Sequence, residues 1–189
     1  ILKMKTLIVV DMQNDFITGS LGTKEAQAIL PNVKQKIREY VDRGDRVIFT
    51  RDTHDTDYLQ TQEGKMLPIE HCIRGTNGWQ LEDEVNKIAK DLFVNSDLQP
   101  VCINKGSFGY SDWNVLYDVL CICDEIELIG VCTDICVISN ALILKSLLLE
   151  VKITVDASCC AGTTPEIHKD ALKVMRSCQI NVIGDDGND

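Results

Sequence analysis

The segment that determines the fold class comprises residues 125–155, EIELIGVCTDICVISNALILKSLLLEVKITV. Residues 125–131 form a short apolar run that predicts a buried strand, and the longer run 134–150 has the length of a helix. Residues 152–155 predict a second strand. A strand, a helix and a strand in this order predict a βαβ unit, whose right-handed crossover leaves the two strands parallel.

The same alternation continues on both sides of this segment. Further strands are predicted at 6–10, 46–50, 101–104 and 180–183. Further helices are predicted at 26–43, 80–92, 114–123 and 165–177. The strands are apolar throughout, which is typical of a parallel sheet that is covered on both faces. The sequence therefore predicts an α/β fold, a three-layer sandwich with a mostly parallel sheet and helices on both faces.

The chain is expected to form one domain. No internal repeat and no Pro/Gly/Ser-rich linker divides its 189 residues, and a chain of this length can bury a large core. Residues 52–78 are polar and rich in turn-forming residues, so they predict a long loop. We expect a single domain over residues 1–189, with residues 184–189 as a loose acidic tail.

The charge balance argues against nucleic acid as a partner. Lys and Arg total 19 and Asp and Glu total 29, which gives a formal net charge of −10. A negative surface repels phosphate backbones, and no basic run offers a local exception.

The cysteines and the apolar segments favour a cytoplasmic protein. Nine cysteines are an odd number and are scattered through apolar segments, so they do not resemble a disulfide framework and suit a reducing compartment. Residues 1–5 lack the apolar region of a signal peptide. The most apolar stretch, 135–149, is interrupted by Asn140 and Lys145 and is too short to span a bilayer. We expect no association with a membrane.

Polar side chains follow several of the predicted strands. Asp11 follows the first strand, Asp52 and His54 the second, Lys105 the third, and Cys136 lies just beyond the strand that ends at residue 131. In parallel sheets, ligands bind beyond the carboxyl ends of the strands. An acid, an amine and a thiol are therefore expected to converge on one edge of the sheet.

Cys136 is the candidate nucleophile. If Thr133 and Asp134 cap the long helix, Cys136 lies in its first turn, where the partial positive charge of the helix terminus favours a thiolate. Backbone N–H groups there can also donate to an oxyanion. Considered alone, a cysteine in an apolar segment more often packs as a small hydrophobic side chain, and that interpretation is preferred for the other eight.

Asp11 and Lys105 are the candidate partners of the thiol. A carboxylate at the end of an apolar strand is costly unless it is paired or functional, although Asp11 by itself could equally form a turn or cap a helix. Lys105 alone is more simply explained as a surface lysine. Next to Asp11 and Cys136, it would stabilise both the carboxylate and a thiolate.

A second group of side chains has the composition of a metal site. Asp52 and His54 are two residues apart at a strand end, so their side chains can point the same way, and His71 lies in the following loop. One carboxylate and two imidazoles suit Zn²⁺, Fe²⁺ or Mn²⁺. Solvated loop residues are the alternative interpretation, and His168 is expected to be exposed on a helix.

The chain resembles the isochorismatase-like cysteine hydrolases, and within them the nicotinamidases. The matching segments run nearly from end to end: VVDMQNDF at 9–16, TRDTH at 50–54, LP at 67–68, HC at 71–72, GT at 75–76, NKGSF at 104–108 and GVCTDICV at 130–137. The last of these, in combination with the first, is specific for the family. The resemblance implies a central parallel sheet of six strands.

The resemblance also implies the roles of the candidate residues. Asp11, Lys105 and Cys136 would form the catalytic triad, and a cis peptide bond before Cys132 would place the N–H groups of Cys132 and Cys136 in an oxyanion hole. Asp52, His54 and His71 would bind one divalent metal, with zinc expected and iron or manganese as alternatives. That metal would take the pyridine nitrogen of a small amide substrate such as nicotinamide, and a homo-oligomer is expected.

Other features of the sequence bear on the substrate. Phe16, Phe108 and Tyr110 are candidates for an apolar wall around a flat ring. Residues 55–58 lack the additional histidine of some nicotinamidases, Leu67 replaces an aromatic residue, and Glu63 is a candidate further ligand. The alternative function is another hydrolase of the family that cleaves a ureido, carbamoyl or vinyl-ether substrate without a metal.

Overall fold

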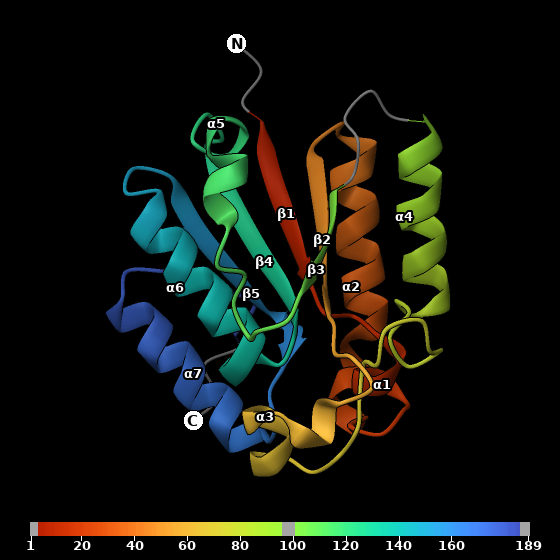
Figure 1. The fold of residues 1–189 in the computed structure, drawn as a ribbon. Helices are drawn as coiled ribbons and strands as arrows, with labels where there is room; N and C mark the ends of the chain where they lie inside the picture. The colour runs from red at the N-terminus through yellow and green to blue at the C-terminus, as the bar shows by residue number, and fades with distance from the viewer. Residues whose placement is uncertain (1–3, 96–100, 186–189) are drawn as a thin grey trace.

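The computed structural model describes residues 4–95 and 101–185 of the chain (Figure 1). Residues 186–189 of the predicted acidic tail lie outside this range. The strands are β1 (Lys5–Val10), β2 (Arg46–Asp52), β3 (Val101–Lys105), β4 (Glu125–Val131), β5 (Lys152–Ala161) and β6 (Asn181–Ile183). The helices are α1 (Asn14–Ile17), α2 (Lys24–Asp42), α3 (Gln62–Met66), α4 (Asp83–Asn95), α5 (Tyr117–Leu120), α6 (Ile138–Leu147) and α7 (Pro165–Ser177). Two 3₁₀ turns, η1 (Tyr58–Gln60) and η2 (Trp113–Leu116), and a π-helical turn, η3 (Thr133–Val137), complete the described elements.

The sheet topology confirms the predicted fold class. Within the described residues the sheet has six strands in the order β3-β2-β1-β4-β5-β6, and every neighbouring pair is parallel. The chain builds the sheet outward from β1 in one direction and then, from β4, in the other. The order therefore reverses between β1 and β4, and this switch point is where α/β sheets bind ligands.

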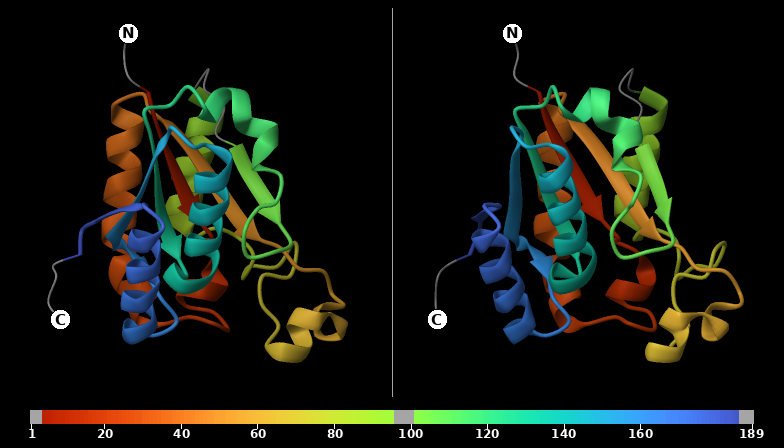
Figure 2. Two further views of the ribbon diagram at one scale, coloured as in Figure 1. Left: turned by 90° about the vertical axis from the view of Figure 1, so that its left-hand side faces the viewer. Right: turned by 60° about the vertical axis from the view of Figure 1, so that its left-hand side comes forward.

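Alternate residues of the central strands face opposite helical layers. Leu7 and Val9 of β1 pack in one apolar cluster with residues of α2 and α4, whereas Ile8 and Val10 pack in the other with residues of α6 and α7. Figure 2 shows α2 and α6 on opposite sides of the sheet. The period of two along a strand explains the continuous apolar runs, because both faces of the sheet are covered.

Helices α2 and α7, which cover the sheet, begin where the sequence provides a threonine cap. The Thr23 hydroxyl accepts a hydrogen bond of 3.0 Å from the N–H of Ala26 at the start of α2. Thr164 likewise accepts from the N–H of Ile167 at the start of α7, where Pro165 occupies the first position. Among the described residues, no helix has the length and apolar character needed to cross a membrane.

Several predicted boundaries differ from the structure. The predicted helix 134–150 is divided into the π-helical turn η3 and α6, and the predicted helix 114–123 is reduced to η2 and α5. Strand β5 continues to Ala161, beyond its predicted end at residue 155. The predicted loop 52–78 contains η1 and α3, which were missed because short turns in a polar segment carry no apolar periodicity.

Gly130 allows β1 and β4 to approach closely next to the switch point. Its φ angle is +117°, and a Cβ added there would lie 2.1 Å from the Val10 carbonyl oxygen. The pairing of β4 with β5 also shifts register between Leu128 and Gly130. We expect Gly130→Ala to lower the free energy of unfolding by about 3 kcal/mol or more, since both backbone strain and a backbone clash oppose it.

Urea denaturation of Gly130→Ala and a matched variant checks this expectation. Gly44 also has a positive φ, +74°, but an added Cβ there meets nothing within 4 Å. Gly44→Ala should therefore lower the free energy of unfolding by only about 1 kcal/mol. Equal losses for the two variants would show that the contact with Val10 is unimportant.

Candidate active site

The structure brings the three candidate catalytic residues together at the switch point. Asp11 directly follows β1 and has a φ of +50°, a conformation that Asp tolerates better than most residues. Lys105 is the last residue of β3, and Cys136 lies in the turn η3 after β4. The side chains of all three are almost completely shielded from solvent.

Lys105 is the centre of this cluster. Its Nζ lies 2.6 Å from Asp11 Oδ2 and 3.5 Å from Cys136 Sγ, and it donates a hydrogen bond of 3.1 Å to the Ser107 carbonyl oxygen. The other carboxylate oxygen of Asp11 accepts a hydrogen bond of 2.7 Å from the Thr50 hydroxyl. The acid, the amine and the thiol are thus in direct contact, and their positions depend on neighbouring strands.

Burial dominates the electrostatics of the cluster. It raises the pKa of Asp11, although Lys105 acts in the opposite direction. It also raises the pKa of the Cys136 thiol well above its usual range, and the negative charge of Asp11 adds to this effect. Burial alone would lower the pKa of Lys105, but Asp11 and Cys136 outweigh it and raise that pKa. Desolvation of Cys136 therefore acts against the thiolate, which a helix terminus was expected to favour.

The residue that caps the turn η3 differs from the predicted one. Cys132, not Thr133 or Asp134, precedes the turn as its N-cap, and no side chain caps it. The peptide bond between Val131 and Cys132 is cis, as the resemblance implied. His168 was predicted to be exposed, but it is half-buried, and its Nδ1 shares a hydrogen bond of 2.7 Å with the Thr133 hydroxyl.

The three candidate metal ligands and Glu63 form one cluster. Asp52 ends β2, His54 follows it, and Glu63 lies in α3. The ligand atoms of these residues and His71 all lie within 4.8 Å of one another. Asp52 Oδ2 is 3.0 Å from His54 Nε2 and 3.4 Å from His71 Nε2, and Glu63 Oε1 is 3.5 and 3.8 Å from the same two nitrogens.

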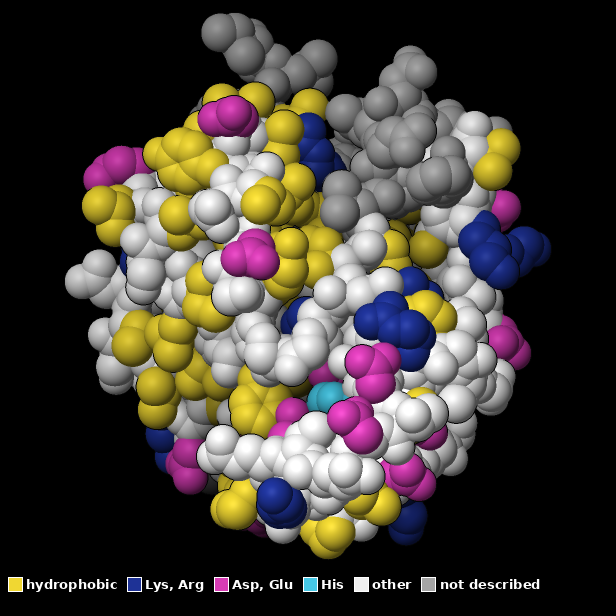
Figure 3. Space-filling view, viewed as in Figure 1, with side chains coloured by type: hydrophobic (Ala, Val, Ile, Leu, Met, Phe, Trp, Pro, Cys, Tyr) yellow, Lys and Arg dark blue, Asp and Glu magenta, His cyan; other side chains and the backbone are white. Residues whose placement is uncertain are grey.

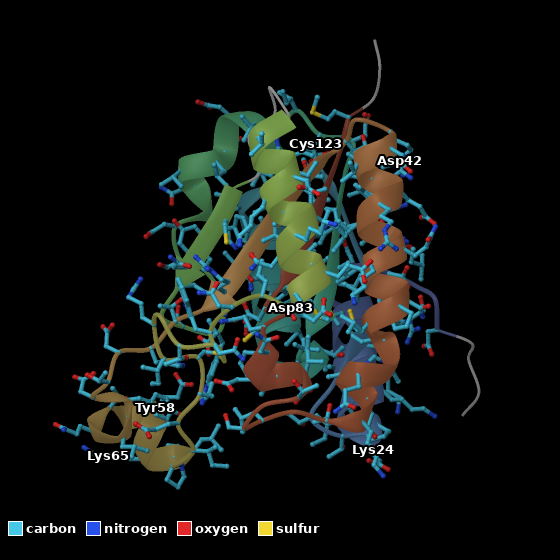
Figure 4. The ribbon with its side chains drawn as sticks, turned by 90° about the vertical axis from the view of Figure 1, so that its right-hand side faces the viewer. Lys24, Asp42, Tyr58, Lys65, Asp83 and Cys123 are labelled. Carbon is cyan, nitrogen blue, oxygen red and sulfur yellow. The ribbon has the colours of Figure 1, made fainter. Side chains whose placement is uncertain are left out.

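These four residues fit a divalent transition metal. Ligands about 2.1 Å from a tetrahedral Zn²⁺ are separated by about 3.4 Å, which agrees with the observed spacings. The Nδ1 of His71 donates a hydrogen bond of 2.8 Å to the Ile69 carbonyl oxygen, which orients the ring so that Nε2 faces Asp52 and Glu63. The ring of Tyr58 packs 4.6 Å from His54 and 5.0 Å from His71, and its position at the strand ends is visible in Figure 4.

The charges of the two clusters are coupled. Lys105 Nζ lies 4.0 Å from Asp52 Oδ1. Burial alone would raise the pKa of Asp52, but hydrogen bonds with the two histidines and the charge of Lys105 hold it well below its usual range. Asp52 is therefore ionised, as a metal ligand must be.

A cavity of about 270 Å³ connects the thiol with the histidine cluster. Its lining includes Phe16, Phe108, Cys132 and Cys136, together with Asp52, Glu63 and His71. Tyr110 is not among the described residues that line it; its ring packs edge-on against Trp113, with centroids 5.4 Å apart. On this face of the molecule, a histidine is visible beside acidic side chains in Figure 3.

Some residues of the site were not identified from the sequence. Leu21, Thr23 and Thr163 also line the cavity, but they lie in segments far from Cys136 in the sequence and carry no recognisable signal, whereas Ile135 lies next to Cys136 in η3. Gln13 is fully buried, and its side chain bonds both the N–H and the carbonyl oxygen of Asp52. A buried amide so close to Asp11 could have been recognised, since polar groups inside a protein need partners.

The sheet order, with a buried thiol and its charged partners at the switch point, places the chain among α/β proteins equipped for nucleophilic catalysis. The family model of the isochorismatase domain matches residues 5–186, so the chain belongs to the isochorismatase family.

The relatives place the chain in the nicotinamidase-like branch of that family. It is 24% identical over 216 residues to a nicotinamidase of Saccharomyces cerevisiae, with 95% of this chain and 99% of the relative covered. A crystal structure of a pyrazinamidase/nicotinamidase from Streptococcus mutans is 30% identical, with a TM-score of 0.83 and coverage of 95% and 99%. A pyrazinamidase of Pyrococcus horikoshii in complex with zinc is 25% identical, with a TM-score of 0.76 and coverage of 95% and 98%.

Proposed function

We propose that this protein is a metal-assisted cysteine amidohydrolase that cleaves a small amide such as nicotinamide to the carboxylic acid and ammonia. The observation that carries the proposal is one cavity with two functions. The Asp11–Lys105–Cys136 cluster borders it near the thiol, and Asp52, Glu63 and His71 border it elsewhere. Nicotinamidase relatives support this choice of substrate.

In the proposed mechanism, Asp11 is the base that activates Cys136. In this mechanism the resting thiol carries its proton, because burial and the negative charge of Asp11 raise its pKa well above the usual range. Transfer of that proton to Asp11 leaves the sulfur free to attack the amide carbonyl carbon. Lys105 remains protonated and balances the negative charge that moves from the carboxylate to the sulfur.

The backbone and Asp11 complete the reaction. The N–H groups of Cys132 and Cys136 donate to the oxyanion of the tetrahedral intermediate. Asp11 then returns its proton to the leaving nitrogen, ammonia departs, and a thioester remains on Cys136. Water, deprotonated by Asp11, attacks this thioester and releases the carboxylic acid and the free thiol.

Asp52, His54 and His71 would hold the metal, with Glu63 as a further ligand. When bound, a divalent metal, for which we propose zinc with iron or manganese as alternatives, supplies a Lewis-acid position for a pyridine-type nitrogen. Phe16 and Phe108 provide apolar surface for the ring. The protein thereby fixes the orientation of the carboxamide relative to Cys136.

Removal of the metal tests the substrate class. We expect His54→Ala or chelation to lower kcat/KM for nicotinamide by about 100-fold, because the ring loses its orienting contact. An aliphatic amide, if it is accepted, should be affected far less. The measurements are ammonia release on both substrates and metal content of the purified protein, with near one equivalent expected.

Asp57→Ala is the matched control, since Asp57 is an exposed residue of the same segment outside the ligand cluster. Full nicotinamide hydrolysis by metal-free protein would contradict the proposal. The alternative would then be a family member that cleaves a ureido, carbamoyl or vinyl-ether substrate. Three expectations stay predictions: a homo-oligomer, a cytoplasmic location and a single domain. Light scattering of the purified protein tests the oligomeric state.

A further inference from the structure

The turn that carries Cys136 is joined by side chains to the connection that follows β5. Strands β4 and β5 are neighbours, with Val131 paired to Ala161. The chain leaves β4 into the turn η3 and leaves β5 into residues 162–164 and then α7. The two exits therefore run side by side, and α7 packs against η3.

The first link joins the turn to helix α7. The Thr133 hydroxyl is fully buried and shares a hydrogen bond of 2.7 Å with Nδ1 of His168. Thr133 directly follows Cys132, whose N–H is proposed to donate to the oxyanion. The position of His168 is fixed by helix α7, in which it lies and which Thr164 caps.

The second link joins the turn to the cavity wall. One oxygen of the Asp134 carboxylate accepts a hydrogen bond of 2.8 Å from the N–H of Thr163, and the other accepts one of 2.8 Å from its hydroxyl. Thr163 lines the cavity together with Cys132 and Cys136. Asp134 therefore holds a wall residue in a defined position relative to the thiol.

Gly162 allows both links to form. A Cβ added there would lie 2.8 Å from the Cβ of His168 and 2.9 Å from Oδ1 of Asp134. The backbone of Gly162 therefore lies close to both links, and a larger side chain at this position would displace them.

We propose that His168 and Asp134 are positioning residues. Together they clamp the turn η3 onto the start of α7. The clamp keeps the Cys132 N–H and the Cys136 sulfur at fixed positions beside the cavity. This inference rests on the proposed function of Cys136. Neither residue touches the reacting atoms; His168 acts through Thr133, and Asp134 acts through Thr163. The metal ligands and Phe16 belong to other elements, so loss of the clamp affects kcat more strongly than KM.

The kinetic test compares substitutions that break or retain each link. Thr133→Val and His168→Leu remove the first link, and each should lower kcat for nicotinamide by about 10- to 100-fold, because a small displacement of reacting groups is costly. Thr133→Ser and His168→Asn retain a polar atom near the same position and should restore most of kcat. Asp134→Ala should resemble the first pair, and in every variant kcat should fall by a larger factor than KM changes.

A double-mutant cycle separates the link from general damage. Combined Thr133→Val and His168→Leu should be no slower than the worse single variant, since both remove one interaction. Thr6→Val is the matched control. Thr6 is also fully buried, and its hydroxyl lies 3.1 Å from Sγ of Cys123, which Figure 4 shows at the opposite end of the molecule from Tyr58.

Hydrogen exchange provides a readout that does not depend on the substrate. Amides of residues 132–137 should exchange about tenfold faster in Thr133→Val and Asp134→Ala, as expected for loss of a hydrogen bond that holds the turn, and at the wild-type rate in Thr6→Val. Unchanged exchange in this turn, or wild-type kcat in both clamp variants, would overturn the clamp. A wild-type protein that hydrolyses no amide would instead overturn the proposed function, while exchange would still decide the clamp.

Discussion

Cys136→Ala is expected to abolish amide hydrolysis, with kcat lower by about 10⁴-fold or more, because no other group can form the thioester. The fold should persist. Alanine is a good helix former, and the substitution removes only one sulfur atom from the edge of the cavity, at a cost of about 1 kcal/mol. Steady-state kinetics and a thermal unfolding curve of the same preparation measure both effects.

Cys132→Ala is the control that the chain itself offers. Cys132 also lines the cavity, but only its backbone N–H has a role in the proposed mechanism, and alanine keeps that group. Its effect on kcat should therefore be small. If Cys136→Ala kept more than about 1% of the wild-type rate, the covalent cysteine mechanism would be refuted.

Asp11→Asn has the second large expected effect, a fall in kcat of about 10²- to 10⁴-fold. The amide keeps the shape of the carboxylate, but its single oxygen can replace only one of the two acceptor atoms that face Thr50 and Lys105, and it cannot take the thiol proton. The substitution also leaves Lys105 without its closest counter-ion, so we expect some loss of stability. KM should change far less than kcat, because Asp11 is not placed among the ring-binding residues.

Kinetics and unfolding of Asp11→Asn are compared with those of Asp42→Asn. Asp42 is an exposed carboxylate at the end of α2, and Figure 4 shows it far from Tyr58. Its substitution should leave kcat and stability unchanged. If Asp11→Asn unfolded the chain under assay conditions, the residue would be a structural counter-ion for Lys105 and its assignment as the base would lose support.

The fold could be predicted because short segments of the sequence are enough to identify its main strands and helices. Strands β1 and β4 and helix α7 are recognisable from apolar runs, caps and length, and strand–helix alternation limits the topology to a parallel sheet. The short elements within residues 52–78 were missed. Their conformation depends on contacts with the rest of the chain, such as the packing of Tyr58 against His54 and His71.

The sequence by itself determined which chemical groups meet, since parallel strands bring Asp11, Lys105 and Cys136 to one edge of the sheet wherever their exact ends lie. Only the tertiary structure determined how burial affects the ionisation of these groups. Burial raises the pKa of the Cys136 thiol, although local reasoning from the helix terminus favoured a thiolate. The tertiary structure also determined that Thr163 lines the cavity and Tyr110 does not. Packing of distant segments depends on side-chain shape and leaves no periodic signal along the chain.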